Sequence, residues 1–318
     1  MENSSIEIRS WRRFLKRNSN TLIPIIGLVG LLVIFAIFTH GRILGSKNLL
    51  LILNQAYVLL IASVGVFFIM TMGGLDFSQG SIVGVAGIVI AYACRISLPL
   101  AIVLGILTGA LIGLLNGLLN VYLKIPSFIV TICTMFLFRG VVKYLTTDSP
   151  VSAPIWFIQM DSPAIKIPIT LAVLILGYIV YRYTKVGTIL KSIGAGETGA
   201  RYSGIPVRKV KVLVFMIAGA LTGLAAFINL LKVGSITASG GSLVETNVLI
   251  ALVLGGLPIT GGAKANFAAV VVGSILYAVM NNGLVMLKLD PTMQQLIQGL
   301  IFLLVVTITT DRKAGMIK

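Results

Sequence analysis

The sequence predicts an all-α fold: a polytopic transmembrane helical bundle of about ten spans in two related halves, with both termini in the cytoplasm. Hydrophobic residues make up 57% of the chain and charged residues 11%, with a mean hydropathy of +1.04. Soluble domains, in contrast, carry roughly 25% charged residues. The apolar residues fall into runs close to the length of about 20 residues that crosses a bilayer core. Too little polar side chain remains to cover a soluble surface.

Ten apolar runs are the expected spans. Residues 1–21 form a basic N-terminal tail expected in the cytoplasm, residues 22–310 form the transmembrane domain, and residues 311–318 form a second cytoplasmic tail. The connection 146–167 is expected outside as an irregular cap, and the basic connection 184–210 is expected in the cytoplasm. The spans are predicted at residues 22–39, 48–72, 80–94, 98–121, 126–145, 168–183, 211–231, 244–257, 265–284 and 291–309.

The basic residues gather at the ends of the apolar runs. A net charge of +16 would suggest a nucleic-acid partner in a soluble protein. At the ends of membrane spans, however, Lys and Arg set the orientation of the chain, and we expect no nucleic acid. With the N-terminus inside and ten spans, 17 of the 25 Lys and Arg residues lie inside. This asymmetry supports ten spans with both ends in the cytoplasm.

Two stretches about 165 residues apart are similar. GLLNGLLNVYLKIP (113–126) and VMNNGLVMLKLDP (279–291) share an Asn-Gly-Leu, then Leu-Lys, then Pro at a similar distance. Internal repeats are typical of transporter folds, in which the pathway lies between the halves and uses broken helices. Chance similarity between two Leu-rich helices is the alternative.

The sequence lacks the motifs that would carry catalysis or hold a metal. There is no G-x-x-x-x-G-K-[ST] phosphate loop, and the one histidine, His40, cannot build a hydrolytic triad or an H-E-x-x-H zinc site. We therefore expect no catalytic residue, no metal and no cofactor bound by this chain. An enzyme is the weakest class of function for it.

One acidic residue lies in a glycine-rich interruption of the apolar pattern. Asp76 sits in MGGLDFSQGS (72–81), where the glycines allow an unwound helix whose freed backbone groups could line a wet cavity. With Ser78, Gln79 and Ser81 it would offer the donors and acceptors that a hydroxyl-rich substrate requires. Alternatively, Asp76 caps the following helix through its exposed amides. Both roles remain open at this point.

A second acidic residue lies in a similar setting. Glu245, followed by Thr246 and Asn247, is flanked on both sides by glycine pairs, and a helix cap or a buried hydrogen bond is its plainer interpretation. Other polar residues in the spans either line a pathway or hold helices together. This second group consists of Asn54, Gln55, Asn116, Asn120, Thr131, Thr134, Asn281 and Asn282.

The basic cytoplasmic connection contains a compact helix pattern. The run from Glu197 to Arg201, followed by Gly204, Ile205 and Pro206, predicts a short helix closed by glycine and then stopped. Such a helix on a small inner face suggests a docking surface. A solvated basic loop is the alternative.

Several long motifs, in order along almost the whole chain after residue 45, resemble one family. MGGLDFSQGSIVGVAG is similar to its Gly-Gly-Ile-Asp-Leu-Ser-x-Gly-Ser segment, KIPSFIVTICTMFLFRG (124–140) to its Leu-Pro-x-Phe-Ile-Val-Thr segment, and IGAGETGARYSGIPVRKVK (193–211) to its cytoplasmic stretch. ETNVLIALVLGGLPITGG and NNGL also match in order. The family is the permease subunits of bacterial ABC importers, in the branch that includes ribose and other monosaccharide permeases. Branched-chain amino acid and nucleoside permeases are more distant.

The resemblance implies a multi-pass subunit of the bacterial inner membrane that imports a monosaccharide such as ribose by alternating access. It implies a second permease copy, a cytoplasmic subunit that uses ATP and Mg²⁺, and an extracytoplasmic sugar-binding protein as partners, besides membrane lipid. The coupling helix that enters the ATPase would consist of Glu197, Thr198, Gly199, Ala200, Arg201, Gly204 and Ile205. The expected substrate pathway comprises Asp76, Phe77, Ser78, Gln79, Asn54, Asn116, Thr131, Glu245, Asn247 and Asn282.

The chain also departs from the family pattern. Phe77 and Gln79 replace the usual Leu and a small residue, LPIT (257–260) replaces the common Thr-Ser-Leu-Ala, and Thr198-Gly199 replaces an acidic or Ala pair. These differences leave the solute open, and a nucleoside or another small polar solute is an alternative. An ion-coupled secondary transporter would also have repeats and buried acids but needs no docking helix. A channel is disfavoured because no selectivity-filter motif is present.

Overall fold

The computed structural model describes residues 23–309, and most of these residues are helical. Each of the ten predicted spans coincides with one helix. Six are long and apolar enough to cross a membrane: α2 (Ser46–Thr71), α4 (Leu98–Tyr122), α5 (Ser127–Leu145), α7 (Pro163–Tyr183), α10 (Val207–Val233) and α12 (Ala268–Met286). The other four apolar helices are Ile23–Phe38, α3 (Gln79–Ala93), α11 (Val244–Leu254) and α13 (Pro291–Thr309). The chain is a multi-pass membrane protein. Its predicted tails, 1–21 and 311–318, lie outside the described residues.

The chain divides into two compact units. The larger unit comprises Leu53–Leu249 and Ile259–Ala265, and the smaller unit comprises the remaining residues. Helix α2 begins in the smaller unit and ends in the larger one, whereas α11 begins in the larger unit and ends in the smaller one.

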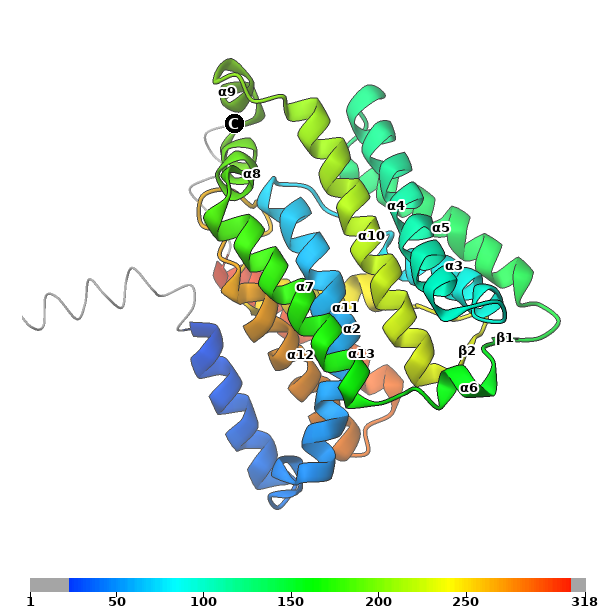
Figure 1. Ribbon diagram of the computed structural model, residues 1–318. Helices are drawn as coiled ribbons and strands as arrows, with labels where there is room; N and C mark the ends of the chain where they lie inside the picture. The colour runs from blue at the N-terminus through cyan, green and yellow to red at the C-terminus, as the bar shows by residue number, and fades with distance from the viewer. Residues whose placement is uncertain (1–22, 310–318) are drawn as a thin grey trace, which may run out of the picture. The chain divides into compact units, whose positions relative to one another are not determined.

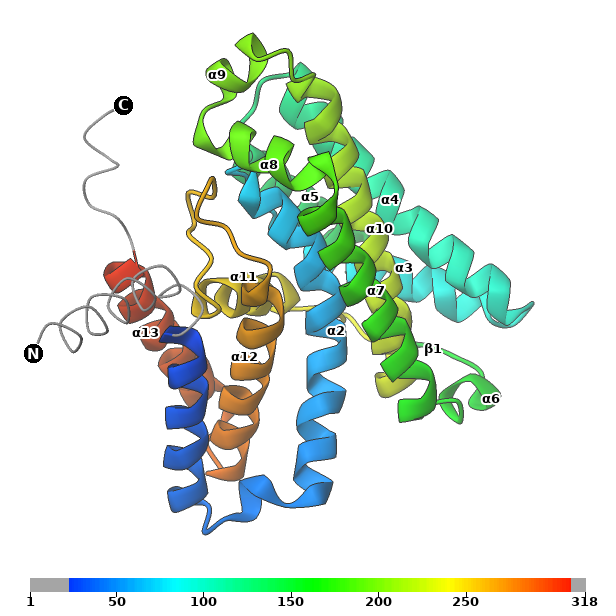
Figure 2. The same cartoon turned by 60° about the vertical axis from the view of Figure 1, so that its left-hand side comes forward.

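Two long helices form the centre of the larger unit. Helices α4 and α10 lie side by side, and α3 packs against both (Figures 1 and 2). Their contact is made by backbone: a Cβ atom added to Gly109 of α4 would collide with the carbonyl of Gly219 of α10, and the reverse also holds. At a second contact, a Cβ atom on Gly223 would collide with the carbonyl of Gly105, and one on Gly105 would collide with Ile90 of α3. Small residues four apart are the usual means by which membrane helices approach this closely.

The connection 146–167 contains more regular structure than expected. Strand β1 (Val151–Ser152) pairs antiparallel with β2 (Ser235–Ile236), and the short helix α6 (Ile155–Ile158) follows. Buried Phe157 of α6 packs edge-on against Phe227 of α10, with ring centroids 5.5 Å apart. Helix α7 begins at Pro163, earlier than the predicted residue 168, because a proline is well tolerated in the first turn of a helix.

The connection 184–210 contains two helices. The predicted short helix is confirmed as α9 (Glu197–Tyr202), which is followed by Gly204 with φ of 80°. The amide of Ile205 closes this end on the carbonyl of Ala200 at 3.1 Å. The helix before it, α8 (Lys185–Ala195), was not expected from the sequence.

The smaller unit holds the helix Ile23–Phe38, the 3₁₀ turn η1 (Arg42–Leu44), α12, α13 and parts of α2 and α11. Its turn after α12 matches the turn after α4 in the larger unit. Lys124 and Lys288 each follow their helix closely with positive φ, 55° and 59°, and a proline comes shortly afterwards in each case. This shared geometry supports the internal repeat.

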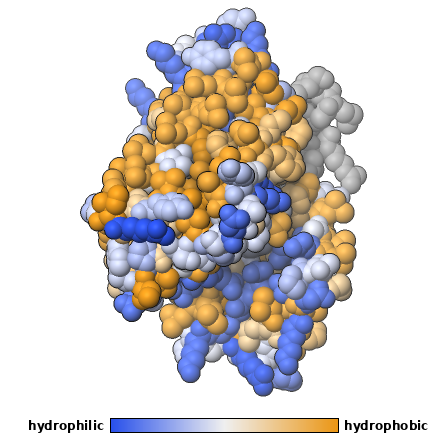
Figure 3. Space-filling view, turned by 90° about the vertical axis from the view of Figure 1, so that its right-hand side faces the viewer, coloured by the Kyte–Doolittle hydropathy of each residue, from blue (hydrophilic) through white to orange (hydrophobic). Residues whose placement is uncertain are grey.

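Hydrophobic side chains cover a broad area on the side that carries α4 and α5 in Figure 1 (Figure 3). They include Leu111, Phe136 and Leu137, each more than half exposed. In water this surface would be costly, whereas in a membrane it can face lipid tails or another helix.

The glycine contact between α4 and α10 leads to a stability prediction. Gly109→Val should lower the free energy of unfolding by about 1–3 kcal/mol or more, because the added atoms overlap the backbone of α10. The matched control is Gly140→Val on α5, where a side chain meets open space. Thermal unfolding of the purified protein in detergent measures both, and equal unfolding temperatures for the two variants would contradict the packing described here.

Candidate functional site

The chain unwinds between α2 and α3, as the glycines predict. Residues 74–78 are not helical, and Gly73 has φ of 80°. The backbone amides freed here are satisfied by hydroxyls from the start of α5: Leu75 N–H donates to Ser127 Oγ, and Phe77 N–H donates to Thr131 Oγ1, both at 3.1 Å. An irregular segment at membrane depth needs such partners because no water is present to replace them.

Asp76 is fully engaged inside this segment. Its Oδ1 accepts hydrogen bonds from the amide of Ser78 at 2.8 Å and from the Ser78 hydroxyl at 2.6 Å. Its Oδ2 accepts from Gln79 Nε2 at 2.6 Å, and the residue is 1% exposed. Because Ser78 is the residue before the first turn of α3, this carboxylate fixes the start of that helix. The hydrogen bonds of Asp76 go to the N-cap residue and to the Gln79 side chain rather than to the backbone amides of the first turn.

The network continues into the two central helices. Asn116 of α4 donates to Ser78 Oγ at 2.9 Å, and the Thr222 hydroxyl of α10 donates to Gln79 Oε1. All four side chains are buried. The side-chain oxygen of Asn116 has no hydrogen-bond partner within the described part of the chain. The start of α3 is thus tied by side chains to both α4 and α10.

Glu245 brings the start of a second short helix to the same place. It lies in the first turn of α11, packs against Gly80 of α3, and forms an ion pair with Arg139 of α5. Its other carboxylate oxygen, Oε2, is buried without a hydrogen-bond partner among the described residues. A Cβ atom at Gly241 would collide with the carbonyl of Gly80, so the chain just before α11 touches the first turn of α3.

Each of the two helices that meet here is shorter than a bilayer core is thick. With 15 and 11 residues, α3 and α11 are roughly 23 and 17 Å long, against a bilayer core of about 30 Å. Their N-terminal ends carry the partial positive charge of the helix dipole, which suits the carboxylates of Asp76 and Glu245. Two broken helices with adjoining N-termini are the arrangement from which transporters build solute sites.

The structure brings most of the predicted pathway residues together and separates the others. Asp76, Phe77, Ser78, Gln79, Asn116, Thr131 and Glu245 surround the junction of α3 and α11. Asn247 lies half-buried on α11. Asn54 accepts a hydrogen bond from buried Lys166 at 3.2 Å, and Lys166 is ion-paired with Asp161. Asn282 belongs to the smaller unit, where it accepts from Asn48 at 2.9 Å.

Sequence reasoning missed four contributors to these contacts. Arg139 interrupts an apolar run and could have been suspected from that position. Ser127, Thr222 and Lys166 gave no comparable signal. Among residues 23–309, no cluster of three or more His, Cys, Asp or Glu side chains could hold a metal ion.

Together these features are those of a membrane transport protein: several apolar helices, two broken helices with adjoining N-termini, and a buried polar network around them. The chain belongs to the family described as branched-chain amino acid transport system / permease component, which it matches over residues 48–306. It is a transport subunit and not an enzyme.

Similar proteins include sugar permeases from several bacteria. The ribose import permease protein RbsC of Bacillus subtilis (strain 168) is 30% identical, covering 91% of this chain and 92% of its own length. The ribose import permease protein RbsC of Escherichia coli (strain K12) is 28% identical, covering 90% of this chain and 93% of its own length. The xylose transport system permease protein XylH of Haemophilus influenzae is 28% identical, covering 94% of this chain and 98% of its own length. No solved structure has significant similarity to the chain.

The ion pair at the junction leads to a second prediction. Arg139→Gln should destabilise the protein by about 3–5 kcal/mol, because Glu245 is then left charged and buried without its cation. Lys143→Gln, one turn further along α5 and exposed, should cost less than about 1 kcal/mol.

Thermal unfolding of both variants tests this, and the single variant Glu245→Gln with the double variant Arg139→Gln/Glu245→Gln completes the cycle. We expect the double variant to be more stable than Arg139→Gln alone. Additive losses in the double variant would contradict a direct coupling of the two side chains.

Proposed function

We propose that this chain is the transmembrane subunit of an ATP-binding cassette importer that carries a monosaccharide across the bacterial inner membrane. It works with a second permease copy, a cytoplasmic ATPase that uses ATP and Mg²⁺, and an extracytoplasmic binding protein. The chain crosses the membrane ten times, at the six long helices and at the other four apolar helices, with both termini in the cytoplasm. The excess of basic residues on the inner side supports this orientation.

The observation that supports the proposal is the direct packing of α8 on the chain where α2 ends and the unwound segment begins. Gly194 of α8 lies against the carbonyl of Thr71, the last residue of α2, and against Gly262. The amide of Gly262 donates to that same carbonyl at 2.9 Å. A Cβ atom at Gly73 would lie 3.9 Å from the Cα of Gly194. A displacement of α8 therefore acts directly on the segment that holds Asp76, because no flexible linker lies between them.

Helix α9 is suited to take up such a displacement from a partner subunit. Glu197 accepts hydrogen bonds from Arg201 at 3.4 Å and from Lys211 of α10 at 2.5 Å, which ties the helix to the membrane-spanning part. Its outer side is open, with Arg201 and Tyr202 exposed. A small, braced helix with an exposed face supports docking of an ATPase more than it supports a solvated loop.

Transport follows as alternating access. ATP-driven closure of the partner subunits moves α9 and α8, and the movement passes through Gly194 to the start of α3. There the Asp76 network fixes the N-terminus of α3, the Arg139–Glu245 ion pair fixes that of α11, and the two ends touch at Gly80 and Gly241. Displacing one of these ends from the other opens or closes the path between them.

The substrate class rests on chemistry and on the named relatives. At the junction the buried side-chain oxygens of Asn116 and Glu245 have no partner among the described residues, and both are suited to accept hydrogen bonds from the hydroxyls of a sugar. The similar proteins are named for ribose, xylose and galactofuranose. We assign a monosaccharide to this chain and leave its identity to the binding protein that accompanies it.

Purification from the native membrane followed by mass spectrometry tests the proposed assembly. The wild-type chain should bring down an ATPase and an extracytoplasmic sugar-binding protein. The double variant Glu197→Ala/Arg201→Ala should lose most of the ATPase, about tenfold or more, because it removes both the brace and the exposed cation of α9. Lys209→Ala, an exposed residue at the start of α10, is the matched control and should keep the ATPase.

A substitution at Gly194 tests how movement of α8 is transmitted to the site. Gly194→Val should reduce solute uptake at least about tenfold while the ATPase still co-purifies, because the added atoms separate α8 from Thr71. Gly299→Val on α13 meets open space and should leave uptake unchanged. Normal uptake by the Gly194→Val complex would contradict coupling through α8 and Thr71.

An ion-coupled secondary transporter is the second candidate. The observation that favours it is the carboxylate oxygen of Glu245, which is buried without a partner in the described structure and could take a proton or a cation. That candidate needs no docking helix. Full transport by the Glu197→Ala/Arg201→Ala variant would favour it over the importer.

A further inference from the structure

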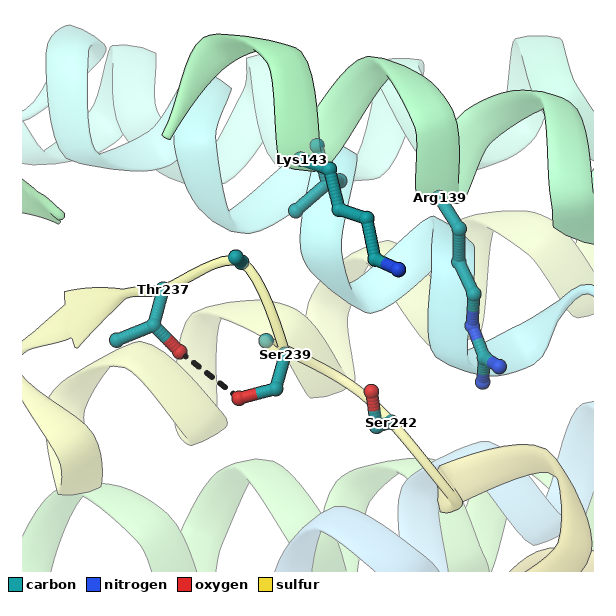
Figure 4. A pocket seen from close by; sticks show the side chains of 8 residues that line it. Arg139, Lys143, Thr237, Ser239 and Ser242 are labelled. Atoms are coloured by element: carbon teal, nitrogen blue, oxygen red, sulfur yellow. Dashed lines mark hydrogen bonds between the residues drawn. The ribbon is translucent and has the colours of Figure 1, made fainter. Parts of the chain in front are cut away.

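A pocket in the larger unit has no role in the function proposed so far. It has a volume of about 370 Å³ and lies between the second half of α5 and the loop 237–242, which leads into α11 (Figure 4). This volume is in the range of small-molecule sites. Its polar side chains are those of Arg139, Lys143, Thr237, Ser239 and Ser242.

The pocket is rich in hydrogen-bond donors and carries positive charge. Arg139 and Lys143, one helical turn apart on α5, both point toward the loop (Figure 4). One guanidinium nitrogen of Arg139 contacts Glu245, which leaves N–H groups on the others, since a guanidinium has five in all. Lys143 has no ion-pair partner within the described residues. With Glu245 counted, the pocket keeps one net positive charge.

The side chains that line the pocket offer few acceptors. None is a carboxylate or an amide, and two of the three hydroxyls, those of Thr237 and Ser239, are 3.2 Å apart and bonded to each other. A neutral sugar presents many hydroxyl donors that need acceptors. A carboxylate only accepts, and Arg and Lys are its strongest partners.

We propose that this pocket binds a sugar-sized solute that carries one carboxylate, with Arg139 and Lys143 holding the carboxylate and the loop hydroxyls contacting the rest. The inference rests on the proposed function and narrows it, because it makes the solute a sugar acid or gives sugar acids preference over neutral sugars. The pocket adjoins Glu245, so a bound solute sits beside the junction of α3 and α11.

Protection of an introduced cysteine tests the proposal. Ser239→Cys is placed in a Cys133→Ser background, since Cys133 is exposed and Cys94 is buried. The full-length protein in nanodiscs of neutral lipid is labelled with N-ethylmaleimide, an uncharged reagent, in the presence of D-glucuronate or D-glucose. Glucuronate should protect at a concentration about fivefold lower than glucose, the effect of one charge in a partly exposed site. Adding Lys143→Gln should abolish this preference.

Two matched controls accompany the measurement. Ser97→Cys, an exposed residue before α4, should be labelled equally with either sugar. Lys47→Gln, an exposed cation that does not line the pocket, should leave the preference intact. Equal protection by the two sugars, or none by either, would overturn the proposal.

An anionic lipid headgroup has the same charge chemistry and is tested separately. If phosphatidylglycerol in the nanodisc slows labelling and glucuronate does not, the pocket holds lipid and the solute assignment is wrong. ATP-dependent uptake by the assembled complex is measured in parallel with the sugar that it transports. If the complex takes up its sugar but no sugar protects the cysteine at position 239 from labelling, only the pocket assignment is wrong. If the chain supports no ATP-dependent uptake with any partner, the proposed importer is wrong.

Discussion

The close backbone contact between α4 and α10 is the constraint on which the site depends. Gly109 meets Gly219 and Gly105 meets Gly223 with no room for side chains. Thr222 is next to Gly223, and Asn116 is next to Gly117, which packs against Val212 of α10. These two side chains bond Gln79 and Ser78 at the start of α3. If the two helices stood further apart, these buried polar groups would lose their partners, and lipid offers no water to replace them.

The short length of α3 and α11 follows from the same network. Each helix begins inside the protein, where its unpaired amides and positive dipole end need polar partners. Asp76 meets this need at α3, and Glu245 brings a carboxylate to the first turn of α11. The two helix ends touch at Gly80 and Gly241, a contact much smaller than the long interface of α4 and α10.

The helices could be read from the sequence because apolar runs determine them almost alone, and all ten predicted spans coincide with helices. The unwound segment at Asp76 was also predictable, since its glycines and polar residues stand out in an apolar context. The partners of these residues were not. Thr222 and Ser127 look like ordinary helix residues, and only tertiary packing brings them to Gln79 and Leu75. Helix α8 was missed because it is short and lies in a basic stretch that was interpreted as a loop, although Val186, Ile189, Leu190 and Ile193 recur at helical spacing.

The central claim is that ATP hydrolysed by partner subunits drives movement of solute through this chain. Uptake of radiolabelled sugar into proteoliposomes that contain the assembled complex and its binding protein tests it most directly. The account predicts uptake that requires ATP and continues when ionophores abolish every ion gradient. Uptake that proceeds without ATP and stops when a proton or sodium gradient is removed would contradict it, and would make the unpaired oxygen of Glu245 the first candidate for ion coupling.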